Sequence, residues 1–110
     1  MSRLPTPPDT FVEFTQRYPM LGEAWKLVGE AGRAGPLDEK TGRLVKLAAS
    51  MGSLREGAVH SAVRKAVASG VSRDEIDQVI AVVASTLGFP ATVAVYSWVR
   101  DELDGRESRG

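Results

Sequence analysis

The chain has 110 residues, a length that suits a single domain built around one hydrophobic core. Hydrophobic residues make up 43% of the sequence and charged residues 25%, which is typical of a folded globular domain and excludes a disordered chain. Basic and acidic residues both number 14, so the formal net charge is zero, and this argues against a dedicated nucleic-acid-binding protein.

The residue types that are missing exclude further classes of function. The sequence has no cysteine, which excludes disulfides, thiolate nucleophiles and zinc sites with cysteine ligands. The only histidine is His60, so a metal site would need carboxylates almost alone, and we expect neither a metal nor another cofactor. The weakly polar stretch 79–99 is interrupted by polar residues, and residues 1–10 lack the apolar run of a signal peptide. We therefore expect no membrane association and a soluble, cytoplasmic protein.

The first third of the sequence predicts an extended arm followed by two helices. Pro5, Pro7 and Pro8 favour an extended arm over residues 1–10, which ends at two residues suited to a helix N-cap. A short helix then stops before Pro19, and a second helix begins there. The second helix carries apolar residues on one face and is ended by Gly35-Pro36.

The middle of the sequence predicts a helical hairpin. Asp38 caps a helix that runs to Gly52, and a further helix over residues 54–69 is closed by Gly70. Ser72 and Glu75 have the spacing of a capping box, in which each side chain binds the backbone N–H of the other residue.

The capping box opens a helix over residues 73–87, and a last helix covers residues 91–103. Gly88-Phe89-Pro90 separates the two, and residues 105–110 form a flexible polar tail. Valine-rich stretches in both helices suit strands on propensity alone, but their length, the caps and the lack of alternation favour helices.

The fold class is therefore all-α, with about six helices around the central hairpin and with residues 11–104 as the folded domain. The helices over 73–87 and 91–103 are apolar on more than one face, and a chain of this length has too little material to cover both. We expect this surface to be buried between copies of the chain.

Three residues at a spacing of four form the main candidate site. Glu56, His60 and Arg64 lie on one stripe of the helix over 54–69. Glu56 is placed to bind one imidazole nitrogen and fix its tautomer, which leaves the other nitrogen for a substrate proton. The alternative is a solvated ladder of charges without a chemical role.

Other polar residues favour structural interpretations. Asp38-Glu39 and Asp74-Glu75 lie in first turns, where carboxylates complement the helix dipole. Asp101, Glu102 and Asp104 are interpreted as a solvated helix end. The Gly88-Phe89-Pro90 break is either a plain turn or the lining of a small cavity.

Three segments of the sequence resemble the carboxymuconolactone decarboxylase family, which includes the alkylhydroperoxidase D-like proteins. They read PLDEKTGRLVKLAASMG, REGAVHSAVRKAVASGVSRDEIDQVI and TLGFPATVAVYSWV, and the similarity covers roughly residues 20–103. The resemblance implies an all-helical subunit with the alkylhydroperoxidase D-like fold. It also implies a homotrimer or homohexamer with sites at or near subunit contacts.

The redox branch of this family uses a Cys-x-x-Cys pair, a histidine and a glutamate. With Gly70 as the anchor, the resemblance places the cysteines at Arg55 and Ala58, the histidine at Ala62 and the glutamate at Arg43. No thiol is present for a disulfide cycle, so we expect no peroxidase activity.

The decarboxylase branch places acid/base residues on the same helix and needs no cysteine. With the same anchor, the resemblance places the histidine of this branch near Ala62. Together with the stripe on the helix over 54–69, the resemblance favours a cofactor-free enzyme acting on a small anionic organic molecule, with His60 and Glu56 as catalytic residues and substrate-binding groups at Arg64 and Gly88-Phe89-Pro90. Arg55 is a further cation that suits a substrate anion. The alternative is a non-catalytic oligomeric protein that binds a small molecule or acts as a scaffold.

Overall fold

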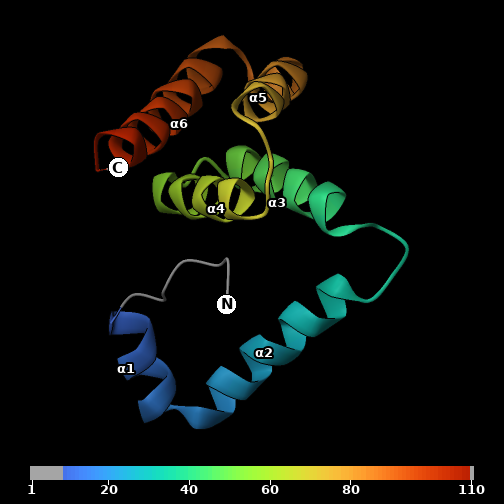
Figure 1. Cartoon of the computed structure of the whole chain (residues 1–110), viewed down its shortest axis with the longest axis vertical. Coiled ribbons are helices and arrows are strands. Elements are labelled where there is room, and N and C mark those ends of the chain that lie inside the picture. Colours follow the sequence, from blue (N-terminus) through green and yellow to red (C-terminus); the bar gives the residue numbers. More distant parts are fainter. Residues whose placement is uncertain (1–8, 110) are drawn as a thin grey trace.

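A computed structural model describes residues 9–109, which form six helices and no strand (Figure 1). The helices are α1 (Asp9–Arg17), α2 (Pro19–Arg33), α3 (Glu39–Ser53), α4 (Glu56–Ala68), α5 (Arg73–Leu87) and α6 (Phe89–Arg109). The prediction of an all-α chain with about six helices is confirmed. The arm predicted over residues 1–10 falls almost wholly on residues 1–8, which lie outside the described residues, and α1 begins at Asp9.

The centre of the fold is the hairpin of α3 and α4. Asp38 caps α3 as predicted, because its Oδ1 accepts a hydrogen bond from the backbone N–H of Thr41 at 2.7 Å. Leu54 follows α3 in a left-handed conformation, with φ at 54°, and reverses the chain. The prediction that the next helix includes Leu54 is therefore wrong, since α4 begins only at Glu56.

Local signals also place α5 and α6. Gly70 follows α4 with φ at 88°, a conformation in which a side chain is strained. The capping box is confirmed: Ser72 Oγ accepts from the Glu75 N–H at 3.1 Å, and Glu75 Oε1 accepts from the Ser72 N–H at 2.9 Å. Gly88, with φ at 87°, separates the two helices, and α6 continues to Arg109, past the predicted end near Leu103.

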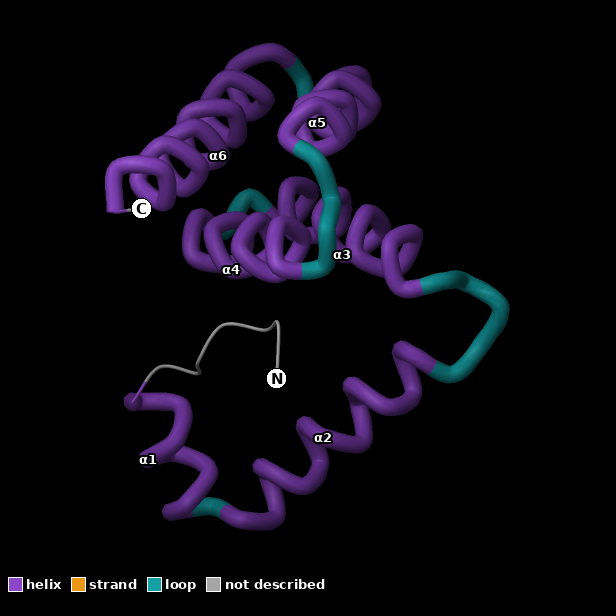
Figure 2. Tube along the Cα trace, in the orientation of Figure 1, coloured by secondary structure: helices purple, strands orange, loops and turns teal. Residues whose placement is uncertain are grey.

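The core lies between the hairpin and the pair α5–α6. Helix α3 packs against α5 and helix α4 packs against α6, so the second pair covers one side of the first (Figure 2). The buried apolar residues come from these four helices and the turn after α4: Leu47, Met51, Val59, Val63, Ala66, Val71, Ile76, Ile80, Val95, Val99 and Leu103. Burial of this apolar surface is the main favourable contribution to folding.

Helices α1 and α2 lie on the side of the hairpin that faces away from α5 and α6 (Figure 1). These two helices are called the α1–α2 arm below, which is distinct from the extended segment predicted over residues 1–10. No residue of the arm is buried in the single chain. Its exposed large apolar residues are Phe11, Val12, Phe14, Tyr18, Met20, Leu21, Trp25, Leu27 and Val28, and α5 and α6 expose Val82, Phe89, Val93 and Tyr96. Exposed apolar residues are thus present on α5 and α6, where the sequence predicts a surplus, and the α1–α2 arm adds a second exposed apolar surface.

Two glycines of the hairpin provide a matched test of the backbone. Gly70→Ala is expected to destabilise the fold by about 1–2 kcal/mol, because alanine is strained in the left-handed region. Gly42→Ala is expected to stabilise it by about 0.5–1 kcal/mol, because Gly42 lies within α3 and a Cβ there meets no atom within 4 Å. Urea unfolding measures the change in the free energy of unfolding for both variants. Changes of the same sign would contradict this assignment of the helix ends.

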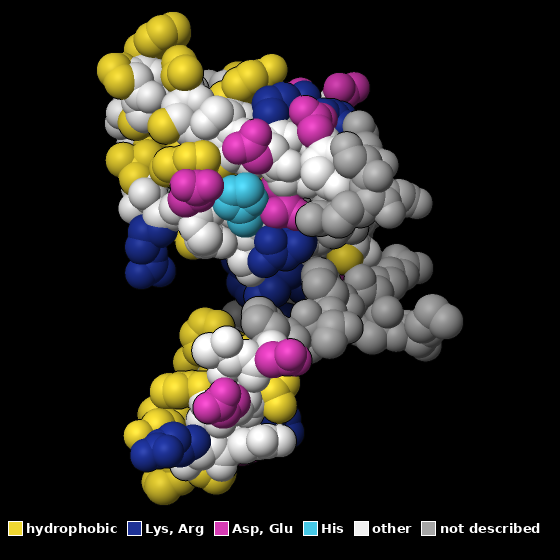
Figure 3. Space-filling model, turned by 90° about the vertical axis from the view of Figure 1, so that its left-hand side faces the viewer, with side chains coloured by type: hydrophobic (Ala, Val, Ile, Leu, Met, Phe, Trp, Pro, Cys, Tyr) yellow, Lys and Arg dark blue, Asp and Glu magenta, His cyan; other side chains and the backbone are white. Residues whose placement is uncertain are grey.

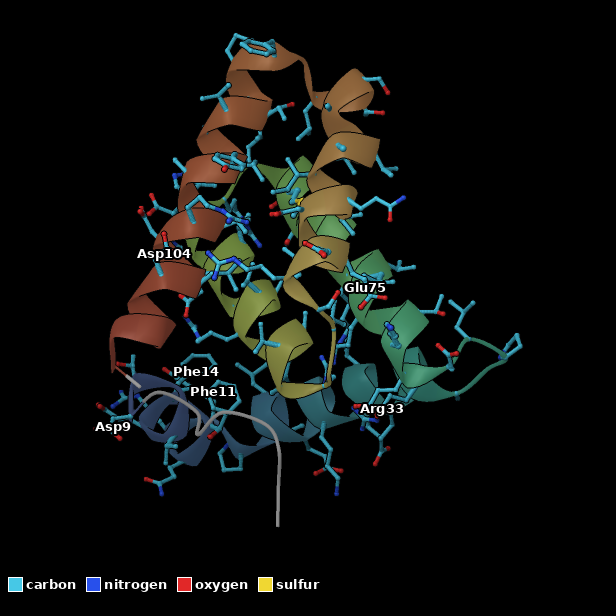
Figure 4. The ribbon with its side chains drawn as sticks, turned by 45° about the horizontal axis from the view of Figure 1, so that its top comes forward. Asp9, Phe11, Phe14, Arg33, Glu75 and Asp104 are labelled. Carbon is cyan, nitrogen blue, oxygen red and sulfur yellow. The ribbon has the colours of Figure 1, made fainter. Side chains whose placement is uncertain are left out.

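A second prediction concerns how the stability of the fold falls at acid pH. Glu75 lies at the start of α5 beside α3 (Figure 4), and its Oε2 is 2.6 Å from Lys40 Nζ. The hydrogen bond from Lys40, with that from the Ser72 backbone, lowers the pKa of Glu75 below the ordinary 4.5. A carboxylate with a lowered pKa contributes stability above its unfolded pKa, and this stability is lost as the pH falls through the folded pKa.

Glu75→Gln is therefore expected to lower the melting temperature at pH 7 and to flatten its decline below about pH 4.5. Glu39→Gln, which changes an exposed carboxylate in the first turn of α3, is the control and is expected to keep the decline of the parent. If the melting temperatures of the parent and of Glu75→Gln fall equally steeply below about pH 4.5, the capping box and its ion pair are not formed in solution.

Candidate functional site

The predicted stripe on α4 is present, and two of its members are in contact. Glu56, His60 and Arg64 follow one another at one turn of helix each, and Glu56 Oε2 lies 3.2 Å from His60 Nε2. Glu56 belongs to the first turn, so its carboxylate also faces the positive end of the helix dipole. Figure 3 shows the histidine at the surface, bordered by acidic and basic side chains.

A fourth residue, Glu102 of α6, completes this site. Its Oε1 lies 2.9 Å from His60 Nδ1 and accepts a hydrogen bond from Arg64 Nη1 at 3.0 Å. The Glu102 side chain is only 6% exposed, whereas the side chains of His60 and Arg64 are 23% and 37% exposed. Packing of α6 against α4 thus places a buried carboxylate under two side chains of the stripe.

This geometry corrects two predictions. Glu56 binds one imidazole nitrogen as predicted, but the second nitrogen is not free, because Glu102 occupies it. The interpretation of Glu102 as part of a solvated end is wrong, while Asp101 and Asp104 are exposed as predicted, and Asp104 Oδ1 accepts a hydrogen bond from Arg73 at 2.6 Å. The difference follows from helix geometry, since only Glu102 of the three faces α4.

The spacing along α6 contained the missing signal. Val95, Val99 and Glu102 lie at i, i+4 and i+7, the spacing of one helix face, and all three are buried. An acid that continues an apolar stripe is expected to be buried and to require a cationic partner. The sequence shows this stripe, but it does not show that the partner lies 42 residues earlier.

The electrostatics of the site depend on one oxygen atom. Glu102 Oε1 lies within hydrogen-bond distance of both His60 Nδ1 and Arg64 Nη1. Glu102 Oε2 is buried and has no hydrogen-bond partner among the described residues. The two carboxylates beside His60 are both satisfied only by a doubly protonated ring, since a neutral imidazole has one N–H. When His60 is protonated, the positive charges of His60 and Arg64 equal the negative charges of Glu56 and Glu102, and the net charge of the cluster is zero.

This arrangement suits the transfer of a proton by the His60 ring. A buried carboxylate on Nδ1 fixes the ring orientation, and Nε2 points to Glu56, whose side chain is 58% exposed. Among the described residues, no group of three or more His, Cys, Asp and Glu side chains is arranged to hold a metal ion.

The structure does not bring the Gly88-Phe89-Pro90 break to this cluster within the single chain. Phe89 begins α6 and Glu102 lies 13 residues later, which separates them by about 20 Å along the helix axis. Phe89 is 81% exposed and points away from the core. Any contact between this break and His60 therefore requires a second copy of the chain.

Two surface grooves lie elsewhere on the subunit, and neither is lined by Glu56, His60 or Arg64. The first, of about 340 Å³, is apolar and lies between α3 and α5. The second, of about 280 Å³, lies between α2, α3 and α4. Arg43, Ala58 and Ala62, three of the positions at which the sequence resemblance places redox residues of the family, line the second groove.

A family model, described as the carboxymuconolactone decarboxylase family, matches residues 19–101, which span α2 to α5 and most of α6. The chain belongs to this family. No curated protein and no solved structure gives a match. Within the described residues of this family member, no helix has the length and apolar character needed to cross a membrane.

The matched region ends one residue before Glu102. The matched region therefore includes His60 and Arg64 but not Glu102, the buried carboxylate that joins them.

The burial of Glu102 yields a direct prediction. Glu102→Ala is expected to destabilise the fold by about 1–3 kcal/mol, because it leaves His60 and Arg64 without their shared partner and opens a gap beneath them. Asp101→Ala removes a neighbouring exposed acid and is expected to change stability by less than about 0.5 kcal/mol. Denaturant unfolding at pH 7 measures the difference, and equal effects would show that Glu102 is solvated.

Proposed function

We propose that this member of the carboxymuconolactone decarboxylase family is a cofactor-free acid/base enzyme in which His60 transfers a proton to a small organic anion. The observation that carries the proposal is the imidazole held by a buried carboxylate on Nδ1, with Nε2 facing the exposed Glu56. Family membership supports a decarboxylation as the reaction type.

In the proposed reaction, the bond between the substrate and its carboxylate carbon breaks and carbon dioxide leaves with its oxygen atoms. The electron pair of that bond remains on the substrate as a dienolate next to a lactone carbonyl. The imidazolium of His60 donates the Nε2 proton to the carbon of this anion, and solvent restores the proton afterwards. Charge balances, because the dienolate keeps the negative charge of the carboxylate that leaves as neutral carbon dioxide, and the proton then neutralises it.

The other residues of the cluster have separate roles in this proposal. Glu102 is a positioning residue that fixes the ring and stabilises its positive charge. The exposed side chain of Glu56 swings away from Nε2 when substrate enters. Arg64 uses one nitrogen for Glu102, and its remaining N–H groups hold a second carboxylate or the lactone oxygen of the substrate.

We further propose that the working form is a homotrimer or homohexamer in the cytoplasm. Proteins of this family are commonly oligomeric, and the exposed apolar residues of the α1–α2 arm and of α5 and α6 supply surface for such contacts. A neighbouring subunit then brings its Gly88-Phe89-Pro90 break against the His60 cluster, which gives these residues their substrate-binding role.

A second candidate function rests on the occupation of both imidazole nitrogens. In that case the cluster ties α6 to α4, and the protein is a non-catalytic oligomer that binds a small molecule or serves as a scaffold. A disulfide cycle for peroxide reduction is excluded, because the sequence has no cysteine.

Turnover of carboxylated lactones and β-keto acids, followed as carbon dioxide release, tests the proposal. His60→Gln is expected to lower kcat at least about 100-fold, because glutamine retains hydrogen bonding but transfers no proton. Glu102→Gln is expected to lower kcat with little change in KM, whereas Asp101→Asn on the same turn of α6 is expected to keep the parent rate.

Unchanged turnover in His60→Gln would remove His60 from the mechanism. If none of these compounds is turned over but one raises the melting temperature of the parent, the second candidate function is favoured instead.

A further inference from the structure

The groove between α3 and α5 is an apolar surface that the single chain leaves open. Its volume is about 340 Å³, and its apolar walls are Leu44, Val45, Ala48, Val79, Val82 and Val83. Val82 is 66% exposed and Val45 is 54% exposed, although both lie in the lining of the groove. A second apolar surface that covered these side chains would release the water around them, and this release is favourable.

Helix α2 of the α1–α2 arm presents an apolar face of matching character. Its apolar stripe recurs at spacings of three and four residues, and it consists of Leu21, Ala24, Val28 and Ala31. The charged residues of α2 lie on the opposite face: Glu23, Lys26, Glu30 and Arg33. Figure 3 shows hydrophobic side chains gathered along one side of the arm. The helix is therefore suited to a partner that covers one face and leaves the other in water.

The apolar surface of the arm is too large for a chain that stays alone. Its four aromatic side chains are 39–59% exposed, and at about 200 Å² each they present about 400 Å². The five exposed aliphatic residues of the arm add on the order of 300 Å². This total exceeds the largest apolar patch of a typical monomer, and it approaches the ~800 Å² that each partner contributes to a stable interface.

The arm does not cover the groove of its own chain. Helices α1 and α2 lie on the side of the hairpin that faces away from α5 (Figure 1). Among the described residues, none from α1 or α2 lines the groove between α3 and α5. Each copy of the chain thus exposes both an apolar helix face and an apolar groove, so a second copy supplies the complementary surface for each.

We propose that α2 of one subunit lies in the groove between α3 and α5 of a second copy. Leu21 and Val28 pack against the valines of the groove, and Ala24 and Ala31 allow the backbones to approach closely. An amphipathic helix that lays its apolar face into a groove is a recurring mode of recognition. This inference rests on the proposed homo-oligomer, whose interface it names, and not on the proposed chemistry of His60.

The proposed contact joins two different surfaces, so the subunits associate head to tail. Each subunit places its arm on one neighbour and receives the arm of another. Head-to-tail contacts of this kind close into rings, which agrees with the proposed homotrimer.

A charge placed in either surface is expected to dissociate the oligomer. Val28→Glu in the arm and Val82→Glu in the groove each change a residue that is more than half exposed in the single chain, so both variants are expected to fold. Each is expected to raise the dissociation constant at least about 100-fold, because association would bury an unpaired carboxylate. Sedimentation velocity of the full-length chain at micromolar concentration measures this change.

Two matched variants serve as controls. Gln16→Glu in α1 and Ala81→Glu in α5 add the same charge at exposed residues outside the two surfaces, and both are expected to keep the oligomeric state of the parent. Leu21→Glu and Val45→Glu form a second pair on the arm and the groove, and they are expected to behave like the first pair.

A mixture of the two dissociated variants tests the head-to-tail contact itself. Val82→Glu retains an unaltered arm and Val28→Glu retains an unaltered groove, so a 1:1 mixture has one intact contact and is expected to form a heterodimer. A misfolded variant would not restore association. A mixture that stays monomeric, although both variants melt at the temperature of the parent, would overturn the proposal.

The remaining outcomes separate this proposal from the earlier ones. A parent that is monomeric at micromolar concentration would overturn both this interface and the proposed homo-oligomer. An oligomer that persists in Val28→Glu and Val82→Glu, or that the control variants dissociate equally, would overturn the interface alone. His60→Gln is expected to keep the oligomer intact, so failure of the acid/base proposal is distinguishable from failure of this one.

Discussion

The orientation of the His60 ring and the polar contact between α6 and α4 depend on one buried carboxylate. Removal of a charged group from water costs several kcal/mol unless other charged groups compensate it in good geometry. Glu102 meets this condition through a single oxygen, which contacts His60 and Arg64 on the facing helix. The same contacts fix the orientation of α6 on α4 and the orientation of the imidazole. The packing of the two helices and the proposed proton transfer therefore have a common physical origin.

Much of the fold could be predicted from the sequence because its boundaries are local. Asp38, the Ser72–Glu75 capping box and Gly88 each act within a few residues, and each is found where the sequence indicated. Leu54 was missed because a left-handed leucine has no sequence signal, and the reversal between α3 and α4 is imposed by packing of the hairpin. The boundary of a helix is predictable when a side chain caps it and much less so when tertiary contacts determine it.

The candidate site was predictable in part for the same reason. Glu56 and His60 are four residues apart on one helix, so their contact follows from helix geometry. The contact between His60 and Glu102 spans 42 residues and depends on how α6 crosses α4. Spacing alone shows that Glu102 continues the apolar face of α6, but the partner that allows its burial is known only once the helices are packed.

Helix α4 presents three faces with different chemistry. One face is apolar and forms the core with α3, α5 and α6; a second carries the His60 cluster; and a third lines the groove between α2, α3 and α4 beside Trp25. Arg43, Ala58 and Ala62, where the sequence resemblance places redox residues of the family, line the groove on this third face. The acid/base side chains Glu56 and His60 lie on the second face.

The most direct test of the central interaction is the ¹⁵N NMR spectrum of the imidazole, since the chain has only one histidine. If Glu102 holds His60, Nδ1 carries a proton that exchanges slowly with solvent, and its signal moves or disappears in Glu102→Gln but not in Asp101→Asn. A ring whose nitrogens exchange rapidly between tautomers, with the same signals in all three proteins, would contradict the buried contact and the chemistry inferred from it.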